Sequence, residues 1–158
     1  MNLYSLPNFV VSIYALTLGI ITFVKGSRNR INHIFLLMSL SIFVWLFSYG
    51  VLFSTNDYGI AMVYGKIGHA AAILLTPLVY YFFIEILGPY RKKIDVFFAR
   101  LAVLLAIFFV LLMIYHPLYL PSLTRQFWGY YPHGGPLMVV YASWTYFVAF
   151  RATFILWL

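Results

Sequence analysis

The sequence lacks cysteine and is poor in acidic residues. Its 158 residues include three Asp or Glu against ten Lys or Arg, with four His. Without cysteine there are no disulfides, zinc–thiolate sites or cysteine nucleophiles. The sequence also has no paired-carboxylate site, no HExxH or GxSxG motif and no glycine-rich phosphate loop. We therefore expect no enzymatic activity and no metal site.

Charge of either sign is scarce, whereas apolar residues dominate. Charged residues make up 8% of the chain and hydrophobic ones 65%, whereas a soluble domain carries about 25% charged residues. Five stretches approach the roughly 20 apolar residues that cross a bilayer. We predict an all-α, polytopic transmembrane bundle forming one domain over 1–158. Its helices are expected at about 6–24, 31–53, 59–87, 96–115 and 136–158.

The basic residues predict how the chain crosses the membrane. They gather in the connections after the first and third apolar stretches, and the other connections have almost none. Cytoplasmic loops collect Lys and Arg, so we place the N-terminus outside, in the cytoplasmic (inner) membrane. Charges in such short loops do not indicate a nucleic-acid partner. The residues that carry this prediction are Lys25, Arg28, Arg30, Arg91, Lys92 and Lys93.

The histidines do not form a haem or metal site. His33 is expected at the inner end of the second helix, and His116 and His133 lie in the outer connection. Only His69 is within a predicted membrane segment, whereas a bis-histidine haem needs two at matched depth. Lys66 is a lone candidate for a retinal Schiff base. We expect no cofactor.

Polar side chains within hydrocarbon are costly and often functional. Lys66 and His69 are three residues apart, so they lie on neighbouring positions of one helix face. Aromatic residues of the connection 116–135 suit a membrane interface. We predict a ligand-binding site formed by Lys66, His69, Trp128 and Tyr130. The alternative is that Lys66 snorkels to the surface and His69 hydrogen-bonds a neighbouring helix.

Pro77 interrupts the third helix near its middle. Proline removes a backbone hydrogen bond and kinks a helix, so we predict a hinge at Pro77. Thr76 is expected to help satisfy the freed backbone group. The alternative is a purely architectural role.

The remaining charges have simple interpretations. Glu85 is expected to pair with the basic residues that follow its helix. Arg151 lies about 22 Å along the fifth helix at 1.5 Å per residue, and is expected to snorkel to the cytoplasmic face. Asp57 and Asp95 are expected in or beside loops.

Three stretches together resemble the N-terminal seven-transmembrane sensor region of bacterial histidine kinases. They are SRNRINHIFLLMSLSIFVWLFSYG (27–50), GKIGHAAAILLTPLVYYFFIEILG (65–88) and FWGYYPHGGPLMVVY (127–141). The resemblance lies in a basic turn before an apolar helix, a glycine-rich helix with central Pro77 and the aromatic pair Tyr81-Phe82, and a Trp-Gly-Tyr-x-Pro-x-x-Gly segment.

This resemblance implies a sensory input module. The family region has about seven helices before a cytoplasmic output domain, whereas this sequence has about five and resembles a truncated form without kinase activity. Expected partners are the lipid bilayer, a small-molecule or lipid ligand, and a second copy of the chain in a homodimer. A small transporter or channel subunit is the alternative function, and it predicts polar residues lining a path on several helices.

Overall fold

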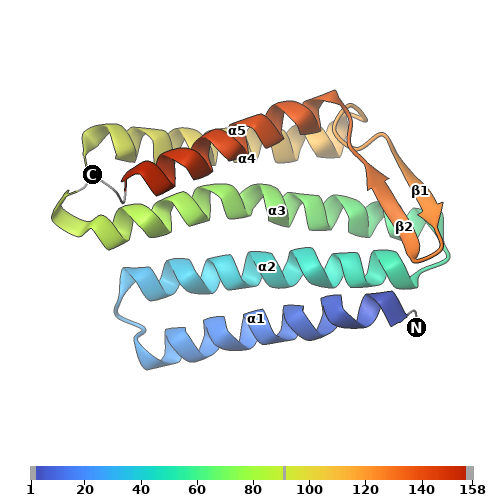
Figure 1. Ribbon diagram of the computed structural model, residues 1–158, viewed down its shortest axis with the longest axis horizontal. Coiled ribbons are helices and arrows are strands. Elements are labelled where there is room, and N and C mark those ends of the chain that lie inside the picture. The colour runs from blue at the N-terminus through green and yellow to red at the C-terminus, as the bar shows by residue number, and fades with distance from the viewer. Residues whose placement is uncertain (1–2, 91, 156–158) are drawn as a thin grey trace.

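The computed structural model describes residues 3–90 and 92–155. Within them, five long helices account for most of the chain (Figure 1). These are α1 (Leu6–Lys25), α2 (Arg30–Ser54), α3 (Tyr58–Leu87), α4 (Lys93–Tyr115) and α5 (Pro136–Ile155). Short 3₁₀ helices at Leu3–Ser5 and Gly88–Tyr90 precede α1 and follow α3. All five long helices have the length and composition to cross a membrane, so the predicted polytopic α-helical bundle is confirmed.

The helices are arranged around α3. Helices α1, α2 and α3 lie side by side in a layer (Figure 1). Helices α4 and α5 both pack on α3 at the edge of that layer, and they also contact each other, since the ring centroids of Phe109 and Tyr141 are 4.9 Å apart (Figure 1). Helix α1 packs mainly on α2 and has mostly exposed apolar side chains. Such exposure suits lipid, because hydrocarbon tails are as apolar as the side chains they touch.

Local side-chain bonds explain where the helices begin. The Asn29 side chain accepts a 3.0 Å hydrogen bond from the backbone of Ile31, and Asp57 accepts one of 2.9 Å from Ile60. Each side chain satisfies an otherwise orphaned N–H of the first turn. Asp95 accepts a 3.2 Å bond from the Lys92 backbone N–H. Helix α4 therefore begins at Lys93, three residues before the predicted start, and Asp95, expected in or beside a loop, lies in its first turn.

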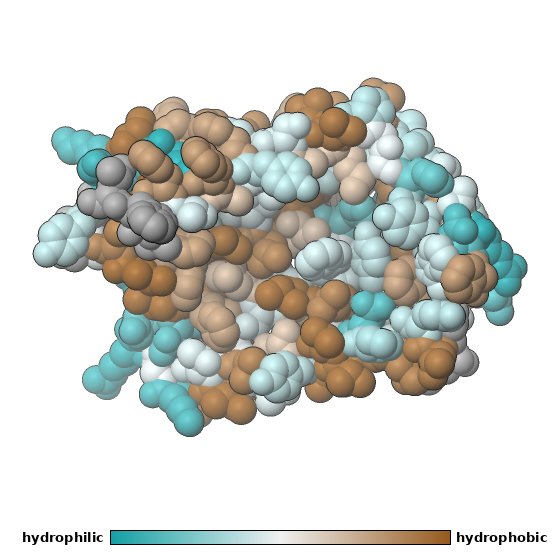
Figure 2. Space-filling view, in the orientation of Figure 1, coloured by the Kyte–Doolittle hydropathy of each residue, from teal (hydrophilic) through white to brown (hydrophobic). Residues whose placement is uncertain are grey.

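The two ends of the bundle differ in charge. Strongly hydrophilic side chains gather toward the ends of the long axis (Figure 2). The α1–α2 and α3–α4 connections lie at the same end, opposite the N-terminus (Figure 1). Lys25, Arg28, Arg30, Lys92 and Lys93 therefore lie at this basic end, as the alternating pattern predicts; Arg91 lies outside the described residues. The chain is a multi-pass membrane protein, and the side that faces the cytoplasm stays a prediction.

The connection 116–135 contains a β-hairpin that the sequence pattern did not predict. Strands β1 (Ser122–Gln126) and β2 (Gly129–His133) pair antiparallel, with Gln126 opposite Gly129. Gly129 has a φ of 129°, and a Cβ there would lie 2.5 Å from the Cα of Phe53. Glycine is therefore required for the hairpin to approach the end of α2.

The hairpin is fastened to the connection between α2 and α3. A nitrogen (Nη2) of Arg125 donates a 2.9 Å hydrogen bond to the Asn56 side chain, and the Tyr130 hydroxyl donates one of 3.3 Å to the Asn56 carbonyl. Tyr130 also packs with Leu52, Ala61 and Leu123. The hairpin thus covers the end of the bundle opposite the basic residues.

Candidate functional site

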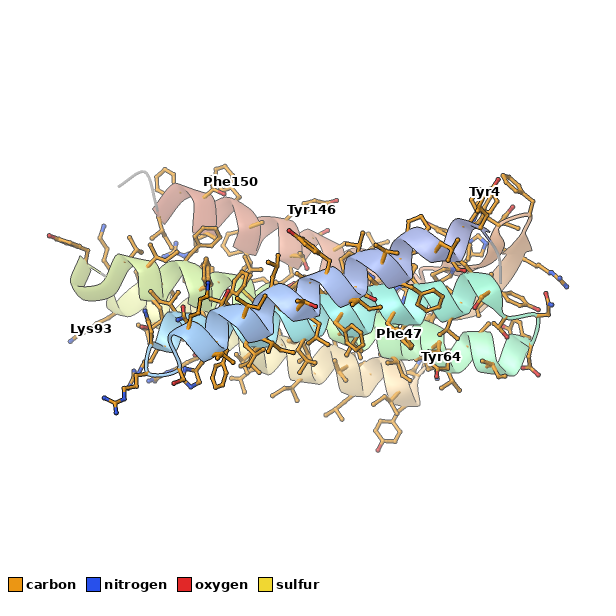
Figure 3. The ribbon with its side chains drawn as sticks, turned by 90° about the horizontal axis from the view of Figure 1, so that it is seen from below. Tyr4, Phe47, Tyr64, Lys93, Tyr146 and Phe150 are labelled. Atoms are coloured by element: carbon orange, nitrogen blue, oxygen red, sulfur yellow. The ribbon has the colours of Figure 1, made fainter. Side chains whose placement is uncertain are left out.

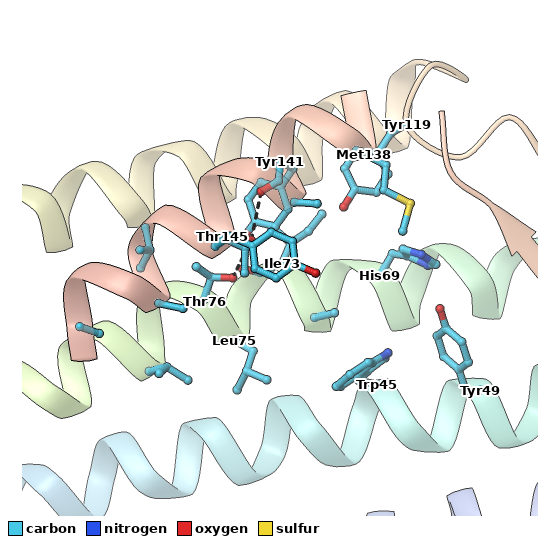
Figure 4. A pocket seen from close by; sticks show the side chains of 17 residues that line it. Trp45, Tyr49, His69, Ile73, Leu75, Thr76, Tyr119, Met138, Tyr141 and Thr145 are labelled. Atoms are coloured by element: carbon cyan, nitrogen blue, oxygen red, sulfur yellow. Dashed lines mark hydrogen bonds between the residues drawn. The ribbon is translucent and has the colours of Figure 1, made fainter. Parts of the chain in front are cut away.

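A cavity of about 460 Å³ lies between α2, α3 and α5 (Figure 4). Helices α2 and α5 form its walls, α3 forms its floor, and Tyr119 closes the end nearest the hairpin. Its volume is within the range of about 300–1,000 Å³ that is usual for small-molecule sites. The lining residues are Trp45, Tyr49, His69, Ala72, Ile73, Leu75, Thr76, Val79, Tyr119, Met138, Tyr141, Ala142, Thr145, Tyr146, Val148, Ala149 and Ala152.

The cavity is apolar with a few polar groups at defined places. His69, Tyr49 and Met138 lie toward the hairpin end, whereas Thr76 and Thr145 lie further along (Figure 4). The hydroxyls of Thr76 and Thr145 are 3.4 Å apart and join α3 to α5. Among the described residues, those lining the cavity include no Lys, Arg, Asp or Glu. The cavity thus offers hydrogen bonds to an occupant without offering a countercharge.

His69 is a deeply buried polar side chain of this cavity, with 4% of its surface exposed. Its ring Nδ1 is 2.8 Å from the Gly65 carbonyl oxygen. A carbonyl only accepts, so Nδ1 carries the proton and donates. The rings of Tyr49 and Tyr119 lie on either side, with centroids 5.9 and 6.2 Å away. The aromatic contacts and the Nδ1 bond fix the imidazole's orientation.

Tyr119 also closes the end of the cavity with its backbone. Its carbonyl accepts a 2.9 Å hydrogen bond from the Gly135 N–H, just before α5 begins. Burial raises the pKa of the Tyr119 hydroxyl, followed in size by the effects of Tyr141 and Tyr49. The hydroxyl is therefore neutral at physiological pH, which keeps this end of the cavity uncharged.

Pro77 is buried on α3, and the helix continues through it. Proline has no N–H, so the carbonyl of Ile73, four residues earlier, loses its helical donor. The Tyr141 hydroxyl of α5 donates a 2.7 Å hydrogen bond to that carbonyl. Tyr141, rather than Thr76, therefore supplies the missing bond. The hinge role of Pro77 stays a prediction.

The structure separates the four residues predicted to bind a ligand. His69 lines the cavity. Lys66 is half-buried and is not among the lining residues. Trp128 lies at the hairpin turn, its ring centroid 4.4 Å from that of Phe127, and Tyr130 is buried in the apolar cluster between the hairpin and the ends of α2 and α3. The cavity and the hairpin are thus two distinct places.

The sequence reasoning did not identify Tyr49, Tyr141 or Thr145 as site residues. These side chains come from α2 and α5, and each is uncharged, so none stood out as a costly polar group. Tyr141 could have been identified by comparing the membrane depths of residues on different helices. Because Pro77 frees a carbonyl within the membrane, a hydroxyl at equal depth on another helix is needed.

A second polar cluster lies at the basic end. An Arg151 guanidinium nitrogen (Nη2) is 2.7 Å from the Asp95 carboxylate, and its Nε donates a 2.9 Å hydrogen bond to the Tyr80 hydroxyl. The guanidinium carbon lies 4.2 Å from the centre of the Phe98 ring. Arg151 therefore does not simply snorkel. It joins α5 to α4 and α3, and Asp95, 4% exposed, is its partner.

The described residues contain no group of three or more His, Cys, Asp or Glu placed to hold a metal ion. What their arrangement offers is space for an elongated apolar molecule, with a buried imidazole near one end. Comparisons with family models, curated proteins and solved structures found no match for this chain.

Proposed function

We propose that the chain is a non-enzymatic sensory module of a membrane signalling protein, and that it binds a small apolar ligand in the cavity between α2, α3 and α5. The single observation that carries this proposal is the cavity itself, which is walled by α5 on one side and α2 on the other. The resemblance to histidine-kinase sensor regions supports the same function.

Helix α5 is the element that an occupant would displace. It is held by few polar contacts: Tyr141 and Thr145 toward α3, and Arg151 at the basic end. Its exposed side chains include Tyr146 and Phe150, which Figure 3 shows away from the helix layer. A ligand that binds better when α5 moves away from α2 shifts the population toward that state. The basic end, where Arg151 lies, then receives the signal.

The test is a distance measurement between α2 and α5. Because the chain has no cysteine, spin labels attach only at Leu40→Cys and Phe150→Cys, two exposed positions. Pulsed electron–electron double resonance would measure the distance between the two labels in phosphatidylcholine nanodiscs. Distances in lipid alone would be compared with those after addition of 11-bromoundecan-1-ol or its methyl ether. We expect a new distance population with either probe.

Two neighbouring substitutions on α5 provide the control. Ala142→Phe fills the cavity and should abolish the new population. Ser143→Phe adds the same ring at an exposed position outside the cavity and should leave it intact. The proposed function would be refuted if neither probe changed the distance distribution of the labelled protein. It would also be refuted if the probes changed the distribution equally in the Ala142→Phe and Ser143→Phe variants.

A transporter or channel subunit is the second candidate. The observation that favours it is the origin of the cavity's polar groups, which come from α2, α3 and α5 through Tyr49, His69 and Thr145 rather than from α3 alone. This function predicts flux of small neutral solutes into proteoliposomes, measured by stopped-flow light scattering. Rates equal to those of empty vesicles would count against it.

A further inference from the structure

We propose that the cavity's occupant is a neutral, single-chain amphiphile of the bilayer, whose hydroxyl donates a hydrogen bond to Nε2 of His69 and whose chain runs along α5 toward Ala152. This inference rests on the proposed function and names the ligand class of the same site. A long-chain alcohol is the simplest molecule of that class.

The polar end of the ligand is assigned by His69. Its Nδ1 donates to the Gly65 carbonyl, so in the neutral ring Nε2 is an acceptor. The described residues make no hydrogen bond to Nε2, although the side chain is 96% buried. Among the described residues, the one fully enclosed side-chain polar atom without a partner is Nε1 of Trp144, so Nε2 of His69 keeps accessible surface from which a ligand can reach it. A ligand hydroxyl would supply the missing donor where His69 lines the cavity (Figure 4).

Charge excludes ionic headgroups. The described residues that line the cavity include no Lys or Arg to pair with a carboxylate and no Asp or Glu to pair with an ammonium group. Moving an unpaired ion out of water into such a place is strongly unfavourable. A neutral hydroxyl avoids this cost, which distinguishes an alcohol from a fatty-acid anion.

The shape of the cavity fits a chain. From Met138 to Ala152 the lining follows α5 for 14 residues, or about 21 Å at 1.5 Å per residue. That exceeds the thickness of one leaflet's hydrocarbon, about 15 Å. Between Thr145 and Ala152 the α5 wall has only Tyr146, Val148 and Ala149. A flexible apolar chain therefore has room over most of this length.

The source of the ligand follows from the exposed part of the wall. Tyr146 and Ala149 line the cavity and are also exposed on the lateral surface of the bundle. That surface faces lipid, so the cavity is open to the bilayer. The His69 end lies toward the hairpin, and the chain end lies toward the basic end. If the hairpin end is outside, as predicted, the ligand has the orientation of an outer-leaflet lipid.

The experiment uses Trp45, which lines the cavity, as a reporter. Bromine quenches indole fluorescence on contact, so the full chain in phosphatidylcholine vesicles would be titrated with 11-bromoundecan-1-ol, its methyl ether and 11-bromoundecanoate. Subtracting the signal of the Trp45→Phe variant isolates quenching at Trp45. We expect saturable quenching, with the alcohol binding about 3- to 10-fold more tightly than the ether, which lacks the donor. The anion should bind more weakly than the alcohol.

The variant His69→Phe keeps a ring of similar size and removes the acceptor. We expect this variant to bind the alcohol about 3- to 10-fold more weakly than the wild-type chain does, with an affinity equal to that for the ether. The affinity for the ether should stay unchanged. Raising the lipid at constant alcohol should reduce quenching, because a ligand from the bilayer responds to its mole fraction there. Quenching that depends only on the aqueous concentration would refute the bilayer source.

Two further outcomes separate this inference from the proposed function. Equal affinities of alcohol and ether in the wild-type chain would overturn the role of His69 and leave an apolar ligand site standing. If the probes quench Trp45 as fully in the Ala142→Phe variant as in Ser143→Phe, neither probe enters the cavity. That result would refute both the ligand class and the proposed function.

Discussion

The Tyr141 hydroxyl of α5 donates a 2.7 Å hydrogen bond to the Ile73 carbonyl of α3. This is the carbonyl that Pro77, four residues later, cannot bond. A residue of α5 thus completes the hydrogen-bond ladder of α3 within the membrane. The two helices share a bond that is internal to one helix in ordinary sequences, and its energy depends on their spacing.

We predict that Tyr141→Phe lowers the free energy of unfolding by about 1–2 kcal/mol, because the Ile73 carbonyl loses its donor in an apolar setting. Unfolding would be followed in mixed micelles with increasing dodecyl sulfate. Tyr146→Phe removes a hydroxyl from an exposed position of the same helix and should change stability by less than about 0.5 kcal/mol.

Pro77→Ala supplies the test of cause. Alanine returns an N–H to the ladder, so Tyr141→Phe should cost clearly less in the Pro77→Ala background than in the wild type. A double-mutant cycle isolates this coupling. Costs that are the same in both backgrounds would show that Tyr141 stabilises the bundle by packing alone.

The Arg151–Asp95 pair predicts a strong asymmetry between single and double variants. Arg151→Met leaves the buried Asp95 carboxylate without its cation and should cost about 3 kcal/mol. Adding Asp95→Asn removes the unpaired charge and should recover at least half of that loss. Arg100→Met, at an exposed position of α4, is the control in the same unfolding assay. Strictly additive losses would contradict the pairing.

The orientation in the membrane is predicted by the basic residues alone. The cysteine-free sequence allows single cysteines to report it. We expect Gln126→Cys, in the hairpin, to react with an impermeant maleimide on intact cells, and Ser27→Cys, in the α1–α2 connection, to react only after permeabilisation. The reverse labelling pattern would place the N-terminus inside.

The Gly129 backbone predicts a localised defect. Gly129→Ala combines a φ of 129° with a Cβ 2.5 Å from the Phe53 Cα, and should destabilise the hairpin by about 2 kcal/mol or more. Trypsin cleavage after Arg125 should then become faster. At Gly65 an added Cβ would meet its nearest side-chain atoms at 3.6 Å, an ordinary contact, so Gly65→Ala should leave the cleavage rate unchanged.

The long apolar stretches allowed the helices to be predicted within a few residues, because a bilayer imposes their length and composition. The predicted start of α4 lay three residues too late because Asp95 was expected in or beside a loop, whereas its carboxylate accepts a bond from Lys92 and pairs with Arg151. Both residues are expected near the cytoplasmic face, so matching their depths would have predicted the pair.

Of the four residues predicted to bind a ligand, His69 is the one that lines the cavity. Intramembrane charge pointed to Lys66, but the cavity wall is built from uncharged residues such as Tyr49 and Tyr141 that look like ordinary apolar helix content. The hairpin was hidden because its strands are short and Pro132 interrupts the second one, which weakens a strand pattern. Which helices flank α3 depends on side-chain packing that periodicity does not encode.

The arrangement of helices around α3 has a consequence for assembly. Helices α1 to α4 each pack on the helix that precedes or follows them in sequence, so each pair can form as soon as both members are in the bilayer. Helix α5 must instead return past α4 to reach α3. Docking of α5 is therefore the assembly step that closes the longest loop. Undocking of α5 would leave the α1–α2, α2–α3 and α3–α4 pairs packed.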